Sequence, residues 1–590
     1  MSLKTQAVPT VIISIIVYYL YQTFVGIIPG PIVDTLSGKV RGSVEVSRGG
    51  RTYFQYLGIP YARPPDGELR FEDPQPALKW EGIRNAYNFG AECLQLEVLI
   101  LGRVIGDEDC LFVNVYTPQV ESRPLMPVMV YIHGGLFMGG SSNIFRGKYF
   151  ADEDVVLVTL NYRVAALGFL SSGDEVLRGN QGLKDQNLAL KWIKDNVRNF
   201  GGDPDRITLF GESAGAASVH YQMISPKSRG LFAKALSMSG TVMRKYTSTD
   251  DKKGQLENFG KKLGCIGDTT KTVVDCLKKV EGHKIVEQHR EAAEALLKNK
   301  FALFVPTTES INDSRTFLGV NPRTSIQDGY FERIPWVAGV VAHEGLIYVA
   351  RVIRDPEATK EMNENWMEVL PKLLKYDPKR KELTRKIKEF YFGMAEQLDV
   401  VNAIEQFSDL LSDRLFIYPA FEAAKVQSRF SPVYLYYLSY KPQTSVYQLI
   451  TSITPNGRIS PVLEFSYSLL KRWFRGKILG LESITYGPSH GDELSLLFNV
   501  HFLARISEGH PDFEFSKTMV KLWASFAKAE KTMAVDGELW EPVNPQDSTS
   551  ALFYVDLNAN STSSTISTKT VNQHLSKRIQ FWDSLKLPYL

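Results

Sequence analysis

The sequence predicts an α/β protein in which helices flank a mainly parallel central sheet within a single large domain. Five short runs predict strands, and they lie at residues 127–132, 155–160, 207–210, 235–238 and 336–341. The first two are continuous apolar runs, as strands covered on both faces should be. Helical patterns separate the runs, and this alternation is typical of a doubly wound sheet. In such sheets functional sites lie at the carboxyl ends of the strands.

The composition of the 590-residue chain is that of an ordinary globular protein, with 44% hydrophobic and 23% charged residues. The formal net charge is only +3. Acidic and basic residues nearly balance, so we expect no nucleic-acid partner. No internal repeat or long low-complexity linker divides the chain. We also expect neither a metal nor a cofactor.

The four cysteines fall into two close pairs. Their spacing is not that of metal ligands such as C-x-x-C. Three disulfide connectivities are possible in principle. We expect pairing within each neighbourhood, Cys93 with Cys110 and Cys265 with Cys276, which closes two short loops.

The N-terminal segment, residues 8–28, is almost wholly apolar and follows one basic residue, Lys4. A signal peptide and an uncleaved membrane anchor both fit it, because it is long enough to span a bilayer but shows no clean small-x-small cleavage site. We therefore expect residues 1–28 to be a signal peptide or signal anchor that precedes a domain at 31–585. The protein would then be secreted, lumenal or anchored through 8–28.

Entry into the secretory pathway makes glycosylation sequons usable. Two are present, at Asn312 and Asn560. We expect both to be glycan sites.

The stretch Leu-Phe-Gly-Glu-Ser-Ala-Gly, residues 209–215, places a serine directly after an apolar strand. A strand that reverses into a helix within one or two residues strains the backbone at its apex. Side chains two positions before and after the apex would clash, so Gly211 and Gly215 stand where the turn allows no Cβ. This is the G-x-S-x-G pattern of a nucleophile elbow. A helix-capping serine leaves the two glycines unexplained, so we expect Ser213 to be a nucleophile.

A serine hydroxyl needs a base to become a good nucleophile. Among nine histidines, His490 stands in Tyr-Gly-Pro-Ser-His-Gly-Asp-Glu, where glycine and proline hold it out of regular structure. Enzymes with this elbow follow the chain order serine, acid, histidine. Glu344 comes directly after the strand at 336–341 and fits the acid. Asp492 is a rival acid, but it lies too close in sequence to His490 to orient its ring easily.

A third feature is a glycine-rich loop after the strand at 127–132. It reads His-Gly-Gly-Leu-Phe-Met-Gly-Gly, residues 133–140, and resembles the oxyanion loop of esterases. The negative oxygen of a tetrahedral intermediate needs backbone N–H donors, and losing one donor costs about 10²–10³ in rate. Ala214, which follows the nucleophile, would supply another such N–H.

Taken together, these motifs resemble the type-B carboxylesterases, the carboxylesterase/cholinesterase family of the α/β-hydrolase fold. Residues 200–215 match the family's serine signature, 108–115 its second signature and 56–65 its N-terminal block. The resemblance runs from about residue 31 to 582. The run after the elbow is most like that of insect carboxylesterases.

The resemblance implies a triad of Ser213, Glu344 and His490. It also implies the two disulfides named above.

The chain departs from the family pattern at three places. The family's oxyanion donors are the second and third glycines of the loop, which here are Gly135 and Leu136, and the Leu136 side chain should crowd the site. The choline-binding tryptophan of cholinesterases has no counterpart in residues 94–109. Of two acyl-pocket aromatics in acetylcholinesterase, Phe304 matches one and Ala302 replaces the other. Choline esters are therefore not the expected substrates.

The resemblance thus implies a serine carboxylesterase that cleaves uncharged, small-molecule esters through an acyl-enzyme. One alternative is an adhesion protein of the neuroligin type, which keeps the fold without a working triad. The complete set of triad residues argues against it. A lipase is the other alternative, but no obvious lid sequence is present.

The segment 440–489 is longer than the family usually needs. Within it, residues 465–479 interleave four basic residues with aromatics and leucines. The insertion either packs on the body of the protein or touches a membrane, since basic and aromatic residues together favour the interface.

Overall fold

The protein is described by a computed structural model. The structure describes residues 27–587 except 98–102, 122, 244–250, 291–303, 395–396, 453–485, 501–502, 504, 530–532, 536–537, 547–553, 558–566 and 570–572. Four sequence predictions lie outside these residues: most of the N-terminal segment, Ala302, residues 465–479 and Asn560. Within the described part of the chain, no helix combines the length and apolar character needed to cross a membrane.

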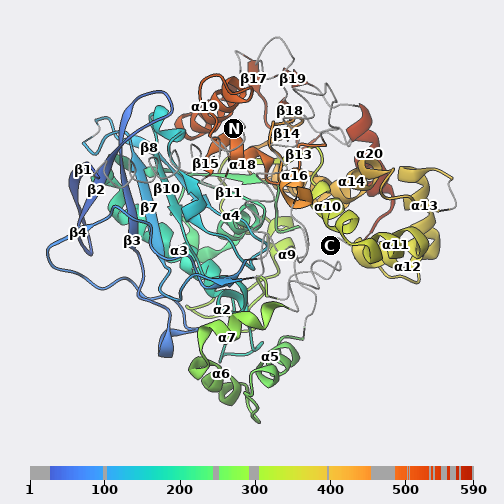
Figure 1. The fold of residues 1–590 in the computed structure, drawn as a ribbon, viewed down its shortest axis with the longest axis horizontal. Coiled ribbons are helices and arrows are strands. Elements are labelled where there is room, and N and C mark those ends of the chain that lie inside the picture. The colour runs from blue at the N-terminus through green and yellow to red at the C-terminus, as the bar shows by residue number, and fades with distance from the viewer. Residues whose placement is uncertain are drawn as a thin grey trace, which may run out of the picture.

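A 13-stranded sheet runs through the centre of the molecule (Figure 1). One end is an antiparallel meander of β1, β2, β3 and β7, with β4 beside β2. Their bounds are Pro29–Thr35, Gly38–Val46, Thr52–Pro60, Phe112–Thr117 and Ile83–Asn85. The sequence analysis did not anticipate this meander.

The remainder of the sheet is mainly parallel, in the order β10-β8-β11-β12-β13-β14-β18, and ends in the antiparallel strand β19. These strands span Val156–Leu160, Met126–Ile132, Gly202–Glu212, Lys234–Met238, Trp336–Val341, Val433–Leu438, Tyr554–Leu557 and Ser567–Lys569. The five runs predicted as strands are β8, β10, β11, β12 and β13. The prediction of a mainly parallel sheet flanked by helices is confirmed.

Alternate residues of each parallel strand enter different hydrophobic cores, because successive side chains of a strand point to opposite faces. In β8, Val128 and Val130 belong to one core, while Met129 and Tyr131 belong to the other. Helices α3 (Gln181–Asn196) and α4 (Ala214–Ile224) contribute to the first core. Helix α19 (Phe513–Lys528) contributes to the second. Burial on both faces explains why these strands are apolar without alternation.

Further helices gather at two places outside the sheet (Figure 1). One group lies below it and contains α5, α6 and α7, at Lys252–Lys262, Thr270–Lys279 and Gly282–Glu287. Another lies beyond its far end and contains α10 to α14 with α20, at Leu346–Arg354, Pro356–Glu364, Trp366–Leu373, Lys381–Phe392, Ile404–Ser412 and Gln573–Ser584.

Both cysteine pairings expected from the sequence are present as disulfides. Cys93 is bonded to Cys110, and Cys265 to Cys276. The second bond connects the end of the α5 region to α6.

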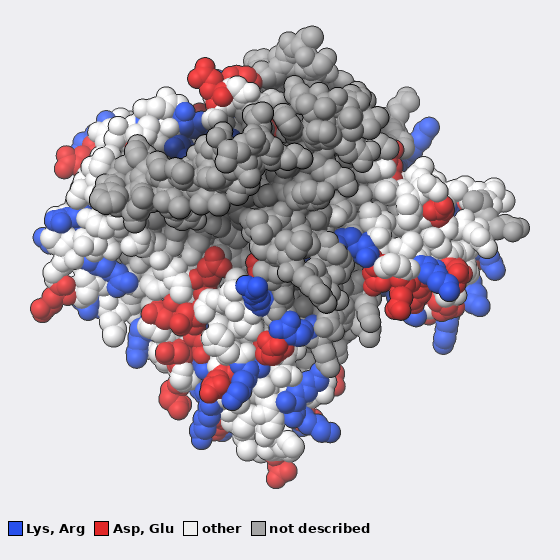
Figure 2. All heavy atoms as spheres, viewed as in Figure 1, with Lys and Arg blue, Asp and Glu red and all other residues white. Residues whose placement is uncertain are grey.

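Charged side chains of both signs are interspersed over the described part of the face shown in Figure 2. This distribution agrees with the near balance of acids and bases in the sequence.

His289 follows α7 and is 1% exposed. Its ring lies beside those of Phe259 and Phe304, at centroid distances of 6.0 and 5.3 Å, and among the described residues neither ring nitrogen has a hydrogen-bond partner. Burial lowers the pKa of His289 to about 3. Charged residues flank His289 in the sequence, yet its side chain faces the core.

We predict that His289→Phe stabilises the protein in acid. Because the folded pKa is below the unfolded value of about 6.5, the unfolded chain binds more protons as the pH falls, and stability is lost below pH ~6.5. At pH ~5 this loss is on the order of 2 kcal/mol. Thermal melts at several pH values should show the gap between variant and wild type widening towards pH ~5. The exposed His283→Phe is the control, and an equal gap for both variants would contradict the prediction.

Candidate active site

Ser213 lies at the turn between β11 and α4, at the carboxyl end of a central strand. Its φ of 58° and ψ of −120° are rare for a residue other than glycine. Its amide donates a hydrogen bond of 2.8 Å to the carbonyl of Met238, the last residue of β12. The strained conformation that the sequence predicted is therefore present and is tied to the neighbouring strand.

The glycines on both sides of Ser213 are required by close backbone packing. A Cβ on Gly211 would lie 2.6 Å from the backbone of Gly215. A Cβ on Gly215 would lie 2.1 Å from the carbonyl oxygen of Ile132, at the end of β8. Any larger residue at either position would push the turn away from β8.

His490 lies between Ser213 and Glu344. Its Nε2 is 2.8 Å from Ser213 Oγ, and its Nδ1 is 2.6 Å from Glu344 Oε2. Glu344 is fully buried, and its Oε1 accepts a hydrogen bond of 2.9 Å from the Val341 amide. The structure thus brings together three residues that the sequence selected from distant parts of the chain.

Backbone contacts between two loops produce this arrangement. The loop after β13 carries Glu344, and the loop before α18 (Asp492–Leu497) carries His490. The His343 amide donates to the Pro488 carbonyl at 3.1 Å, and His343 pairs with Ser489 in a parallel bridge. The two loops therefore run side by side. The next residue along each loop is Glu344 after His343 and His490 after Ser489, so the acid lies beside the histidine.

Asp492, the rival acid, has a different role in the structure. Its carboxylate accepts hydrogen bonds of 2.6 Å from the amides of Ser489 and Val446. Burial raises its pKa to about 7. Asp492 thereby joins the histidine loop to α16 (Val446–Ser452), in agreement with its rejection as the acid that orients His490.

The glycine-rich loop at 133–140 passes beside the nucleophile. A Cβ on Gly134 would lie 3.0 Å from Ser213 Cβ. Among the described residues, the amides of Gly135 and Leu136 donate to no acceptor in the protein. Ala214 is the first residue of α4, so its amide has no partner within the helix. Three backbone donors are therefore available near Ser213.

The side chains of Leu136, Phe304 and Phe416 differ in their surroundings. The Leu136 side chain is partly buried and packs against the core. Phe304 is 2% exposed and lies edge-on to Phe259, with ring centroids 5.2 Å apart. The ring of Phe416 lies 4.7 Å from that of His490 and forms another wall beside the histidine.

Sequence reasoning missed two buried acids beside His490. Glu212 precedes Ser213, and its Oε1 is 3.2 Å from His490 Nε2. Glu493 lies in α18, is fully buried and accepts a hydrogen bond of 3.3 Å from Ser239. Burial, with the nearby carboxylates, raises the pKa of both well above the ordinary value. Burial therefore favours the protonated form of both acids, and only their places close to Ser213 and His490 in the sequence could have marked them.

We predict that Glu493→Gln stabilises the protein as the pH rises. Because the folded pKa is raised, the native state keeps a proton that the unfolded chain releases above pH ~4.3, so stability falls with increasing pH by about 1.4 kcal/mol per pH unit until the folded pKa is reached. Glutamine removes this titration. Denaturant unfolding between pH ~5 and ~8 should show a growing advantage for the variant, whereas the exposed Glu508→Gln control should show none. A constant difference across this range would refute the prediction.

Comparison with known proteins gives a consistent result. The Carboxylesterase family model matches residues 29–582. Venom carboxylesterase-6 of Apis mellifera is 34% identical over 529 residues, or 88% of each chain. Juvenile hormone esterase of Tribolium castaneum is 36% identical over 518 residues, which cover 84% of this chain and 83% of the relative.

A solved structure shares the fold. The crystal structure of juvenile hormone esterase from Manduca sexta, with OTFP covalently attached, is similar with a TM-score of 0.75 and 27% identity. The match covers 94% of this chain and 99% of the solved chain. With the expected fold and strand-end site in place, the chain belongs to the carboxylesterase family and is a carboxylic-ester hydrolase of the α/β-hydrolase fold.

Proposed function

We propose that the protein is a serine carboxylesterase that cleaves uncharged esters through a covalent acyl-enzyme. The observation that carries the proposal is the hydrogen-bonded line from Ser213 Oγ through His490 to Glu344 Oε2. The carboxylate of Glu344 assigns the histidine proton to Nδ1, which leaves the Nε2 lone pair facing the serine.

In the first half of the reaction, Ser213 Oγ attacks the ester carbonyl while His490 Nε2 takes its proton. Glu344 stabilises the resulting imidazolium. The carbonyl oxygen becomes an oxyanion, which accepts hydrogen bonds from the amides of Gly135, Leu136 and Ala214. The intermediate then collapses, and His490 gives its proton to the departing alkoxide, which leaves as the alcohol.

In the second half, water replaces the alcohol. His490 removes a proton from the water as its oxygen attacks the acyl carbon, and the same amides stabilise the second oxyanion. Collapse returns the proton to Ser213 Oγ and releases the carboxylic acid. The covalent attachment of OTFP to the Manduca sexta relative supports covalent chemistry in this family.

We predict that Ser213→Ala lowers kcat by about 10⁴-fold or more, because the variant lacks the attacking oxygen. p-Nitrophenyl butyrate turnover is the measurement, with the melting temperature as the check on folding. Ser218→Ala is a matched control on α4, since Ser218 is buried and bonds to Gln186 and the Ala214 carbonyl. Near wild-type turnover by a folded Ser213→Ala enzyme would remove Ser213 from the mechanism.

We also propose that the protein enters the secretory pathway. Supporting observations are the apolar residues 8–28, the two disulfides, which are typical of oxidising compartments, and the exposed position of Asn312. Glycosylation of Asn560, a domain from 31 to 585 and membrane contact by 465–479 stay predictions from the sequence.

We predict that the full chain, expressed in insect cells, carries N-linked glycan at Asn312. Enzymatic deglycosylation should increase the gel mobility of the wild type, and Asn312→Gln should reduce that shift. Activity in the medium indicates cleavage of the N-terminal segment, whereas activity that stays with membranes until detergent is added indicates an anchor. An unglycosylated enzyme found only in the cytosol would contradict the secretory proposal.

A further inference from the structure

The oxyanion loop has an unusual backbone that its surroundings must maintain. Gly135, Leu136, Phe137 and Gly140 have φ values of 116°, 60°, 61° and 112°. Two of these residues carry side chains, and such conformations persist only where neighbouring groups hold them. The direction of the Gly135 and Leu136 amides depends on this backbone.

The start and middle of the loop have hydrogen-bonded supports. Tyr162 donates its hydroxyl to the His133 carbonyl at 2.9 Å, and its ring stacks on the His133 ring. The Ala165 amide donates to the Phe137 carbonyl at 2.6 Å. Both supports come from the segment that follows β10.

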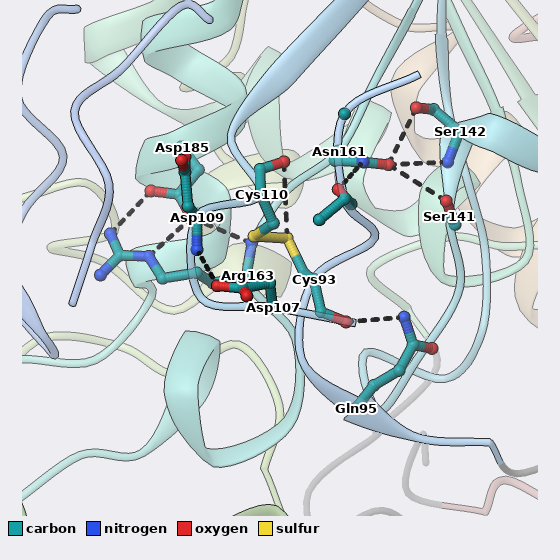
Figure 3. Close-up of a disulfide and its surroundings, with 12 residues drawn as sticks. Cys93, Gln95, Asp107, Asp109, Cys110, Ser141, Ser142, Asn161, Arg163 and Asp185 are labelled. Carbon is teal, nitrogen blue, oxygen red and sulfur yellow. Dashed lines mark hydrogen bonds and ion pairs between the residues drawn. A yellow bond between two sulfur atoms is a disulfide. The ribbon is translucent and has the colours of Figure 1, made fainter. Parts of the chain in front are cut away.

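The end of the loop is held by Gln95. Its Oε1 accepts a hydrogen bond of 2.6 Å from the Gly140 amide, and its Nε2 donates to the Gly140 carbonyl at 2.9 Å. The same Nε2 donates to the Cys93 carbonyl at 2.9 Å (Figure 3). Gln95 is 4% exposed. The side-chain amide therefore pairs with both backbone groups of Gly140, as a neighbouring strand would.

Gln95 belongs to the loop closed by the Cys93–Cys110 disulfide, and further bonds hold the residues just before Cys93 against the same chain segment. Asn161 accepts a hydrogen bond of 2.8 Å from the Ser142 amide (Figure 3). It also donates to the Ala91 carbonyl at 3.1 Å. Asn143 donates to the Gly90 carbonyl at 2.9 Å. The base of the disulfide loop is thus fixed beside the end of the oxyanion loop.

Gly140 is in close contact with the part of the loop that faces the nucleophile. A Cβ on Gly140 would lie 2.3 Å from the Gly134 carbonyl oxygen and 2.5 Å from His133 Nδ1. Gly134 in turn is packed against Ser213. A displacement of Gly140 would therefore change the position of the donors relative to the serine.

We propose that Gln95 is a positioning residue for the oxyanion hole. By pairing with both backbone groups of Gly140, it fixes the loop so that the Gly135 and Leu136 amides point to the developing oxyanion. This inference rests on the oxyanion role given to these amides under Proposed function. Through Gln95, the disulfide loop contributes to the stabilisation of the transition state, although Gln95 itself touches no reacting atom.

Two variants test the proposal from opposite sides of the contact. Gln95→Met keeps the side chain's length and removes its donors and acceptor. Gly139→Ala displaces the Gln95 amide, since the new Cβ would lie 2.6 Å from Gln95 Oε1, and Gly139 does not have a positive φ. Gln181→Met is the matched control, because Gln181 is 2% exposed and donates to a backbone carbonyl, that of Phe71, elsewhere in the protein.

The probes are hexyl trifluoromethyl ketone and hexyl methyl ketone. With the first, Ser213 Oγ adds to the carbonyl carbon, its proton passes to His490, and the carbonyl oxygen becomes an oxyanion that needs the loop's donors. The methyl ketone binds mainly as the unreacted carbonyl.

We expect Gln95→Met and Gly139→Ala to lower kcat for p-nitrophenyl butyrate by about tenfold to a hundredfold, with little change in KM. Both variants should raise the Ki of the trifluoromethyl ketone by a similar factor and leave the Ki of the methyl ketone unchanged.

The outcomes separate this inference from the proposed function. A wild-type enzyme that binds both ketones equally would overturn the oxyanion assignment and the role of Gln95 together. Strong wild-type preference for the trifluoromethyl ketone, unchanged in Gln95→Met and Gly139→Ala, would overturn the role of Gln95 alone. Equal weakening of both ketones, or the same losses in Gln181→Met, would reduce Gln95 to a packing residue. If one of the two variants does not fold, the other decides the question.

Discussion

The close approach of the β11–α4 turn to the end of β8 is the constraint on which the site depends. Only glycine fits at 211 and 215, because the carbonyl of Ile132 and the turn's own backbone occupy the space of a Cβ. This contact places Ser213 beside the loop that leaves β8. Since parallel strands end at one edge of a sheet, the end of β13 brings Glu344 to the same place. The constellation is therefore a consequence of parallel topology and backbone contact.

The buried acidic side chains near His490 add an electrostatic requirement to this packing constraint. His490 contacts Glu344 and Glu212, and Glu493 interacts electrostatically with both of these acids; all three acids are almost fully buried. Three ionised carboxylates in one dry site would repel each other strongly. The raised pKa of Glu212 and of Glu493 reduces this repulsion, because it favours their neutral forms. Glu344 is then the acid that can stabilise a positively charged histidine. The native state therefore tolerates two energetically unfavourable buried acids, Glu212 and Glu493, near the Glu344–His490 pair.

The sequence predicted the parallel strands, the elbow and the residues of the site because each has a local pattern. Buried strands are apolar, the elbow needs two glycines, and loop breakers surround His490. Strands β1 and β2 of the antiparallel meander lack such a pattern, since they mix buried residues with exposed apolar ones such as Ile32. The contacts that give Glu212, Glu493 and Gln95 their roles are made with residues distant in sequence, and no local periodicity predicts these contacts.

Long-range contacts of this kind also decide how an oxyanion hole is built. A backbone donor survives every substitution except one by proline, so Leu136 keeps the N–H that a glycine would supply at this position. The direction of a donor, however, is set by backbone conformation, and an αL leucine and phenylalanine are held there only by their surroundings. Tyr162 and Ala165 support the loop from the sheet side, while Gln95 supports it from the disulfide loop. The proposed oxyanion hole thus depends on supports from two separate segments, whereas the triad depends on strand ends and on the backbone contacts between the loops that carry Glu344 and His490.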